Sequence, residues 1–113
     1  MGEDVAWKQV ESLVGWLDEA VPEGMSRGEV HLLRILKITE EAGEVAEAVT
    51  GAMGGNPRKG RSHTWEDVQK ELADVVVTAM VALHTLSGDG ETVLNERLRH
   101  LVARAGLVPI PGN

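Results

Sequence analysis

Four stretches of the chain carry apolar residues at every third or fourth position, and glycine or proline follows each of them. This spacing places an apolar stripe along one side of a helix, so it predicts four amphipathic helices, over residues 4–20, 27–52, 65–86 and 91–105. The chain has no Phe or Tyr and only three Trp, so aliphatic side chains must build the core. We therefore predict an all-α fold like a four-helix bundle, with residues 1–113 forming a single domain.

Residues that favour helix ends support these bounds. Ser26 followed by Glu29 forms a capping box, and Thr64 is an N-cap candidate ahead of acidic residues in the first turn. The segment 54–63 is glycine-rich and predicts a loop, whereas the tail 107–113 holds two prolines and is expected to be frayed.

Charge and composition exclude several classes of function. The formal net charge of −7 does not attract nucleic acids or anionic lipids, so we expect neither a nucleic-acid polymer nor a membrane as partner. The chain has no cysteine, which excludes disulfides and thiolate metal sites. Its apolar runs are too short to cross a bilayer, and its first residues are acidic where a signal peptide would be basic. We expect a cytoplasmic protein.

Two groups of acids stand out on the second and third expected helices. Residues three and four apart share a helix face, so Glu40, Glu41 and Glu44 lie close together, as do Glu71 and Asp74. Asp74 is surrounded by apolar residues, an unusual setting for a charge. If the two helices pack side by side, the acids repel one another, and a divalent cation would relieve that repulsion. Oxygen ligands favour Mg²⁺ or Mn²⁺, although solvated acidic helix faces are also common.

A di-iron carboxylate site is the competing metal centre. Such sites need a Glu-x-x-His pair on two helices. The second pair here is Glu71-x-x-Asp74, and no His follows any of these acids by three residues. The pattern therefore argues against iron and zinc.

The combined pattern resembles one known family. Glu40-Glu41-x-x-Glu44, then 26 residues, then Glu71-x-x-Asp74 is similar to the motif pair of the MazG-type all-α nucleoside triphosphate pyrophosphohydrolases. The resemblance covers roughly residues 30–105, with the motifs between residues 37 and 74. The loop 56–60, Asn-Pro-Arg-Lys-Gly, resembles that of a short single-domain subgroup.

The resemblance implies an activity and a role for each acid. Members cleave a nucleoside triphosphate between the α and β phosphates, which yields a nucleoside monophosphate and pyrophosphate. Mg²⁺, for which Mn²⁺ can substitute, would be bound by Glu41, Glu44, Glu71 and Asp74, and Glu40 would orient or deprotonate the attacking water. The family also implies a homo-oligomer, either a dimer or a tetramer.

Four cations are candidates for substrate binding. Lys37 shares a helix face with Glu40 and Glu41, so it either holds a phosphate oxygen or forms an ordinary intrahelical ion pair. Arg58, Lys59 and Arg61 lie in the expected loop and either close over the triphosphate or are simply solvated.

Two other functions compete with a general nucleotide pyrophosphohydrolase. One is a non-catalytic protein that senses nucleotides on the same helical scaffold, and the other is a phosphoribosyl-ATP pyrophosphohydrolase. The complete set of acids favours an enzyme, because a protein that only binds has little need for Glu40.

An apolar third helix gives a separate reason to expect oligomers. Residues 72–86 are apolar in nearly every direction, and soluble monomers rarely expose large apolar patches. A two-fold homodimer is the commonest remedy. We expect contacts across or near the interface from Val76, Val77, Met80, Val81 and Leu83.

Overall fold

The computed structural model describes residues 4–108 and 110–111, and within them the chain is all-helical, as predicted. The helices are α1 (Val5–Glu19), α2 (Arg27–Met53), α3 (Trp65–Ser87) and α4 (Gly90–Arg104). Each begins and ends within one residue of its predicted bound. In the tail, residues 107, 108, 110 and 111 are not helical, and residues 109 and 112–113 lie outside the described part.

The predicted capping residues explain these precise starts. Ser26 and Glu29 exchange hydrogen bonds in a complete capping box at the start of α2. Thr64 and Asp67 form a second capping box at the start of α3. Both boxes satisfy backbone N–H groups that have no partner within the helix.

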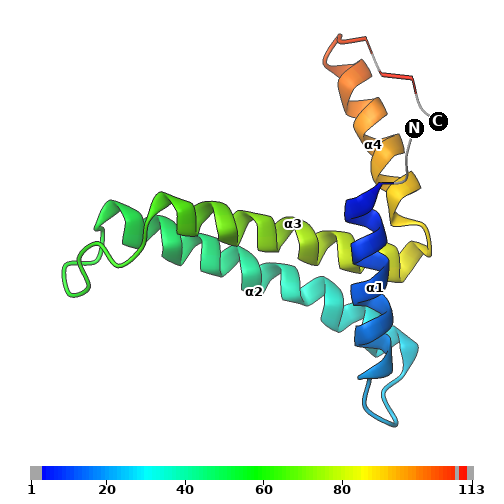
Figure 1. Ribbon diagram of the computed structural model, residues 1–113, viewed down its shortest axis with the longest axis horizontal. Coiled ribbons are helices and arrows are strands. Elements are labelled where there is room, and N and C mark those ends of the chain that lie inside the picture. Colours follow the sequence, from blue (N-terminus) through cyan, green and yellow to red (C-terminus); the bar gives the residue numbers. More distant parts are fainter. Residues whose placement is uncertain (1–3, 109, 112–113) are drawn as a thin grey trace.

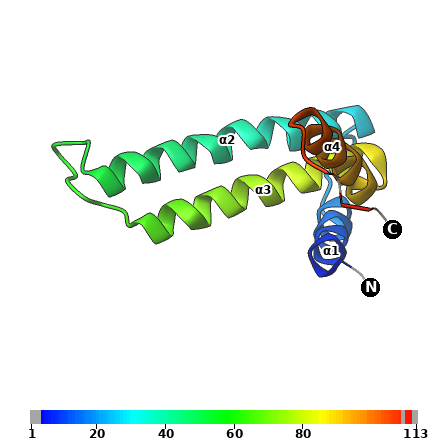
Figure 2. The same cartoon turned by 90° about the horizontal axis from the view of Figure 1, so that it is seen from above.

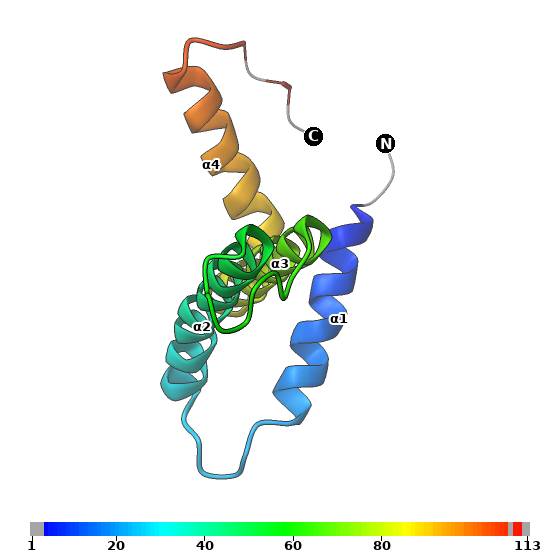
Figure 3. The same cartoon turned by 90° about the vertical axis from the view of Figure 1, so that its left-hand side faces the viewer.

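The four helices form an open arrangement around one long hairpin. α2 and α3 run side by side for most of their length, joined by the loop at one end (Figures 1 and 2). α1 and α4 lie at the opposite end of this hairpin and leave it in different directions (Figure 3). α4 is bent by 111° from α3. The hairpin's middle and its loop end are therefore free of α1 and α4.

The main core lies where α1 crosses α3. Trp7, Val10 and Val14 of α1 are buried against Val81 of α3. Their spacing of three and four residues is the stripe seen in the sequence. Leu17, Met80, Leu83 and Leu94 pack around this cluster.

Trp7 also fixes the corner between α3 and α4. Its ring lies 6.3 Å from the ring of His84, measured between centroids. A Cβ atom at Gly90 would come within 2.6 Å of the Trp7 ring, so only glycine allows this approach. The backbone N–H of Gly90 donates to Nδ1 of His84. The indole ring therefore holds the first turn of α4.

A largely buried guanidinium joins three helices next to this core. Arg34 of α2 contacts the Asp18 carboxylate of α1 at 2.8 Å and donates to the Thr85 hydroxyl of α3 at 2.9 Å. Thr85 in turn donates to the Val81 carbonyl. Arg27 reaches the same carboxylate at 3.1 Å but is mostly exposed. Partial burial alone would raise the pKa of Asp18, but hydrogen bonds from Arg27 and Arg34 outweigh it and hold the pKa below its ordinary value.

Replacing Arg34 by Lys is expected to lower the free energy of unfolding by about 2 kcal/mol, because an ammonium cannot serve both partners with the planar fork of a guanidinium. Arg27→Lys is the matched control, because it changes the exposed partner of the same carboxylate and should cost less than about 1 kcal/mol. Urea unfolding followed by circular dichroism measures both. Equal losses would mean that Arg34 acts only through its charge.

A second, smaller core lies near the loop end of the hairpin. Ala48 and Ala52 of α2 are buried against Val68 of α3. The loop closes over this end, because a Cβ atom at Gly51 would collide with Ser62 and the His63 ring. Small residues on α2 thus let both α3 and the loop approach closely.

The chain is less compact than a closed domain. Its radius of gyration is 17.4 Å, whereas a compact domain of this length has about 13 Å. Large apolar side chains of the hairpin remain exposed: Leu32, Leu33, Leu36, Leu72, Val76 and Val77. Within the described residues, no single helix is long and apolar enough to span a membrane. Only α3 and α4 taken together have the necessary length and composition, and they are bent relative to each other.

The environment of α3 bears on the residues that were predicted for the interface. Val81 is buried in the main core of its own chain, and Met80 and Leu83 pack against that core. Val81 is therefore covered by its own chain, whereas Met80 and Leu83 are only partly buried and stay candidates for contacts across or near an interface. Periodicity alone did not show that α1 would cover this end of α3. Val76 and Val77 stay exposed, as an interface requires.

Candidate metal and nucleotide site

Three carboxylates from two helices converge in the middle of the hairpin. Glu41 and Glu44 of α2 and Glu71 of α3 each offer one oxygen, and these oxygens all lie within 4.8 Å of one another. The side-by-side packing of α2 and α3 brings the two sequence motifs together, as the sequence analysis expected. Along α3, Glu71 of the cluster lies between Val68 of the smaller core and Val81 of the main core.

The electrostatics of this cluster favour a bound cation. Oε2 of Glu71 is buried and has no hydrogen-bond partner among the described residues. A buried anionic oxygen without a partner is costly. Contact with the Glu71 carboxylate and repulsion by the Glu41 charge raise the pKa of Glu44. The three carboxylates therefore lie so close together that charging all of them at once is unfavourable.

Asp74 lies at the edge of the cluster rather than inside it. Its carboxylate is 45% exposed and lies 3.4 Å from the ammonium of Lys70, which also contacts Glu71 at 3.1 Å. These contacts with Glu71 and Asp74 raise the pKa of Lys70. The sequence analysis did not identify Lys70, although its spacing of four residues before Asp74 is that of an intrahelical ion pair.

Glu40 lies outside the cluster and faces solvent. Its side chain is 65% exposed, and its carboxylate lies 3.7 Å from Lys37. Lys37 also lies 3.5 Å from Glu41, so it bridges the solvent-facing acid and one acid of the cluster. The intrahelical ion pairs considered for Lys37 are therefore present, and they place its charge beside the cluster.

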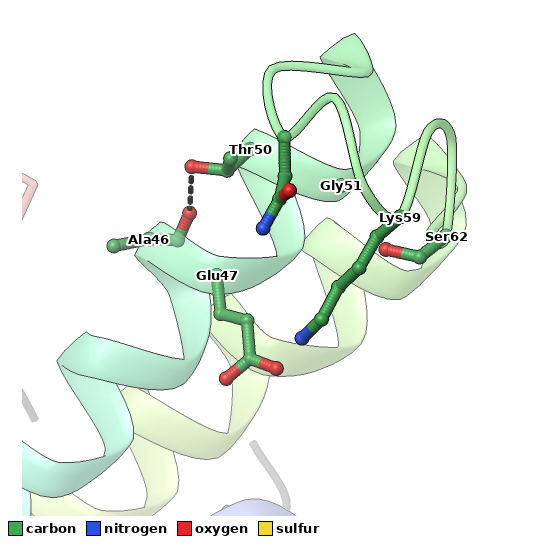
Figure 4. Close-up of a pocket in the computed structure, with 7 residues that line it drawn as sticks. Ala46, Glu47, Thr50, Gly51, Lys59 and Ser62 are labelled. Atoms are coloured by element: carbon green, nitrogen blue, oxygen red, sulfur yellow. Dashed lines mark hydrogen bonds between the residues drawn. The ribbon is translucent and has the colours of Figure 1, made fainter.

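The three loop cations lie at the far end of the hairpin, and they differ in placement. Arg58 and Arg61 are exposed, and the Arg61 side chain folds towards Gly54. Lys59 extends back along α2 towards Glu47 (Figure 4). It helps to line a cavity of about 220 Å³ between α2 and the loop, whose other lining residues are Ala46, Glu47, Thr50, Gly51, Asn56 and Ser62. The sequence analysis did not identify Glu47 or this cavity, which depend on the fold of the loop.

The described residues fit a hard divalent cation. Carboxylate oxygens are the ligands that Mg²⁺ and Mn²⁺ prefer, and the unpartnered Glu71 oxygen supplies a ligand with no competing hydrogen bond. Glu41, Glu44 and Glu71 would hold the ion. Asp74 would join them only by turning away from Lys70.

Comparisons with known proteins agree with this arrangement. Residues 30–105 match the family model of the MazG nucleotide pyrophosphohydrolase domain, a span that contains both acidic motifs and the loop. No curated protein and no solved structure matches the chain. Because the matched span covers well over half of the residues, the chain belongs to the MazG nucleotide pyrophosphohydrolase family.

Proposed function

We propose that this protein is a Mg²⁺-dependent nucleoside triphosphate pyrophosphohydrolase that cleaves between the α and β phosphates. The observation that carries the proposal is the convergence of Glu41, Glu44 and Glu71, with one buried oxygen of Glu71 unpartnered. A site of this kind suits an anionic substrate that arrives together with its metal ion. The family assignment supports the class of reaction.

The residues around the cluster suit the separate tasks of this hydrolysis. Mg²⁺ held there would neutralise charge on the phosphates. Glu40 is solvent-accessible and lies one helical turn from Glu44, so its carboxylate can accept a hydrogen bond from the attacking water and take its proton. Lys37 can hold a phosphate oxygen when the substrate replaces its acidic partners.

Pyrophosphate release from a panel of ribo- and deoxyribonucleoside triphosphates, with Mg²⁺, Mn²⁺ or chelator, tests the activity. We expect release that requires the cation, with a nucleoside monophosphate as the other product. Glu40→Gln should slow turnover while Mn²⁺ still binds in calorimetry, because the residue lies outside the cluster. Release of orthophosphate with a diphosphate product, or no release from any triphosphate, would refute the proposal.

We also propose that the protein works as a homo-oligomer. The exposed side chains of Leu33, Leu36, Leu72 and Val76 come from both helices of the hairpin, in a chain that is far from compact. Burying them against a second copy would remove them from water. Size exclusion with light scattering should give a mass at least twice the 12.2 kDa of one chain. A 12.2 kDa particle at micromolar concentration would disprove this prediction.

A further inference from the structure

The cavity between α2 and the loop is placed to receive one end of a substrate bound at the carboxylate cluster. Glu47 follows Glu44 by three residues, so the two side chains are neighbours on one helix face, about 4.5 Å apart along the axis. The cavity begins at this turn of α2 (Figure 4). Its volume of about 220 Å³ is below the roughly 300 Å³ of pockets that hold a whole drug-sized ligand, so it fits a part of a nucleotide.

The loop wall of this cavity is built by an ordered turn. The Asn56 carbonyl accepts hydrogen bonds from the backbone N–H groups of Lys59 and Gly60, and Gly60 has a positive φ of 63°. The Asn56 side-chain oxygen accepts from the N–H of Arg58 at 3.0 Å. This bond leaves the Asn56 NH₂ group as a donor, and the turn directs Lys59 back over α2.

The charges of the lining favour the nucleoside end of a substrate over its phosphates. The cavity holds one carboxylate, Glu47, and one ammonium, Lys59, so it has no surplus of positive charge. A pyrophosphate group needs such a surplus, and the Glu47 carboxylate would repel it. An uncharged base avoids this repulsion and can lie against α2 where its residues are small, at Ala46 and Gly51.

The polar groups further restrict the base. An ionised carboxylate only accepts hydrogen bonds, so Glu47 can hold a base only through an N–H group of that base. Asn56 and Lys59 supply donors for acceptor atoms of the base. Cytosine meets this pattern, because its amino group lies next to a ring nitrogen and a carbonyl that accept hydrogen bonds. Adenine also meets it, because its amino group lies next to a ring nitrogen that accepts. Uracil and hypoxanthine place a carbonyl oxygen where the amino group would be, and although each has a ring N–H that can donate, the neighbouring carbonyl oxygen then faces the Glu47 carboxylate and is repelled by it.

We propose that this cavity is a nucleobase subsite that selects bases carrying an exocyclic amino group, with Glu47 as the residue that accepts from it. The proposal rests on the proposed nucleotide substrate. It assigns selectivity to a residue outside both acidic motifs, and it separates the role of Lys59 from that of Arg58 and Arg61 in the same loop.

Matched pairs of substrates test the subsite. CTP against UTP and ATP against ITP differ at the amino position, and kcat/KM should favour the amino member by about 10-fold or more. Glu47→Gln should bring both ratios close to one, because an amide can donate as well as accept. Glu11→Gln, at an exposed position of α1, is the control and should keep the wild-type ratios.

Binding of monophosphates separates failure of the subsite from failure of the proposed reaction. Calorimetry with CMP and UMP in the presence of Mg²⁺ should show tighter binding of CMP, and Glu47→Gln should remove the difference. This result would support the subsite even if no triphosphate were hydrolysed. Wild-type ratios near one in both assays, or ratios that Glu47→Gln leaves unchanged, would overturn the subsite while leaving the hydrolysis intact.

Discussion

Replacing Glu44 by Gln is expected to make the metal-free protein more resistant to heat and to abolish its response to Mg²⁺. The side chain is crowded by Glu71 and Glu41, which raise the pKa of Glu44. A carboxyl whose pKa rises on folding favours the folded state at low pH, and this contribution is lost as the pH increases through the raised value. At neutral pH the charge of Glu44 therefore opposes folding until a cation is bound, and Gln removes it.

The same substitution should lower kcat/KM by more than about 100-fold, since changing even the outer partners of metal ligands costs 10–100-fold. Thermal unfolding with and without Mg²⁺, and pyrophosphate release, measure the two effects. Glu11→Gln removes one charge from an exposed position on α1 and should change neither. A Glu44→Gln protein that Mg²⁺ stabilises as much as the wild type would remove Glu44 from the metal site.

Trp7→Ala is expected to have the largest effect on stability, at about 3–5 kcal/mol. The side chain is 5% exposed and is shared by α1, α3 and the first turn of α4. A loss of this size is a large part of the 5–15 kcal/mol that typically stabilises a domain. Urea unfolding followed by far-ultraviolet circular dichroism measures it without relying on tryptophan fluorescence.

Trp16→Ala provides the matched control on the same helix. Trp16 is 66% exposed, and its removal should change the free energy of unfolding by less than about 0.5 kcal/mol. If both substitutions cost the same, the crossing of α1 over α3 does not depend on Trp7, and the corner at Gly90 must be held in another way.

The helices and the acidic cluster could be predicted because local rules decide them. The capping boxes at Ser26 and Thr64 set the starts of α2 and α3, and Gly54 and Gly88 cap their ends. Spacings of three and four residues group the acids on each helix. Two long helices joined by a short loop pack side by side, which brings the acids of one helix against those of the other.

Other features could not be predicted, because they depend on distant contacts. Periodicity does not give the direction in which α1 crosses α3, so it could not show that Val81 would be buried within its own chain. Asp74 stays a predicted metal ligand, and its ion pair with Lys70 is a local contact that the sequence analysis overlooked although the spacing indicates it. The cavity at Glu47 requires a particular turn at Asn56, which no spacing rule indicates.

The separation of the two apolar cores has a consequence for where the helices open locally. The Trp7 core holds α3 at its end near α1 and α4, and the Ala48 core holds α2 and α3 near the loop. Between them, the like charges of Glu41, Glu44 and Glu71 lie close together across the seam. Local opening is easiest where few apolar contacts hold the backbone. Amide hydrogens of α2 and α3 near the cluster should therefore exchange with solvent faster than those at either end. A cation bound by Glu41, Glu44 and Glu71 would join the two halves into a single cooperative unit.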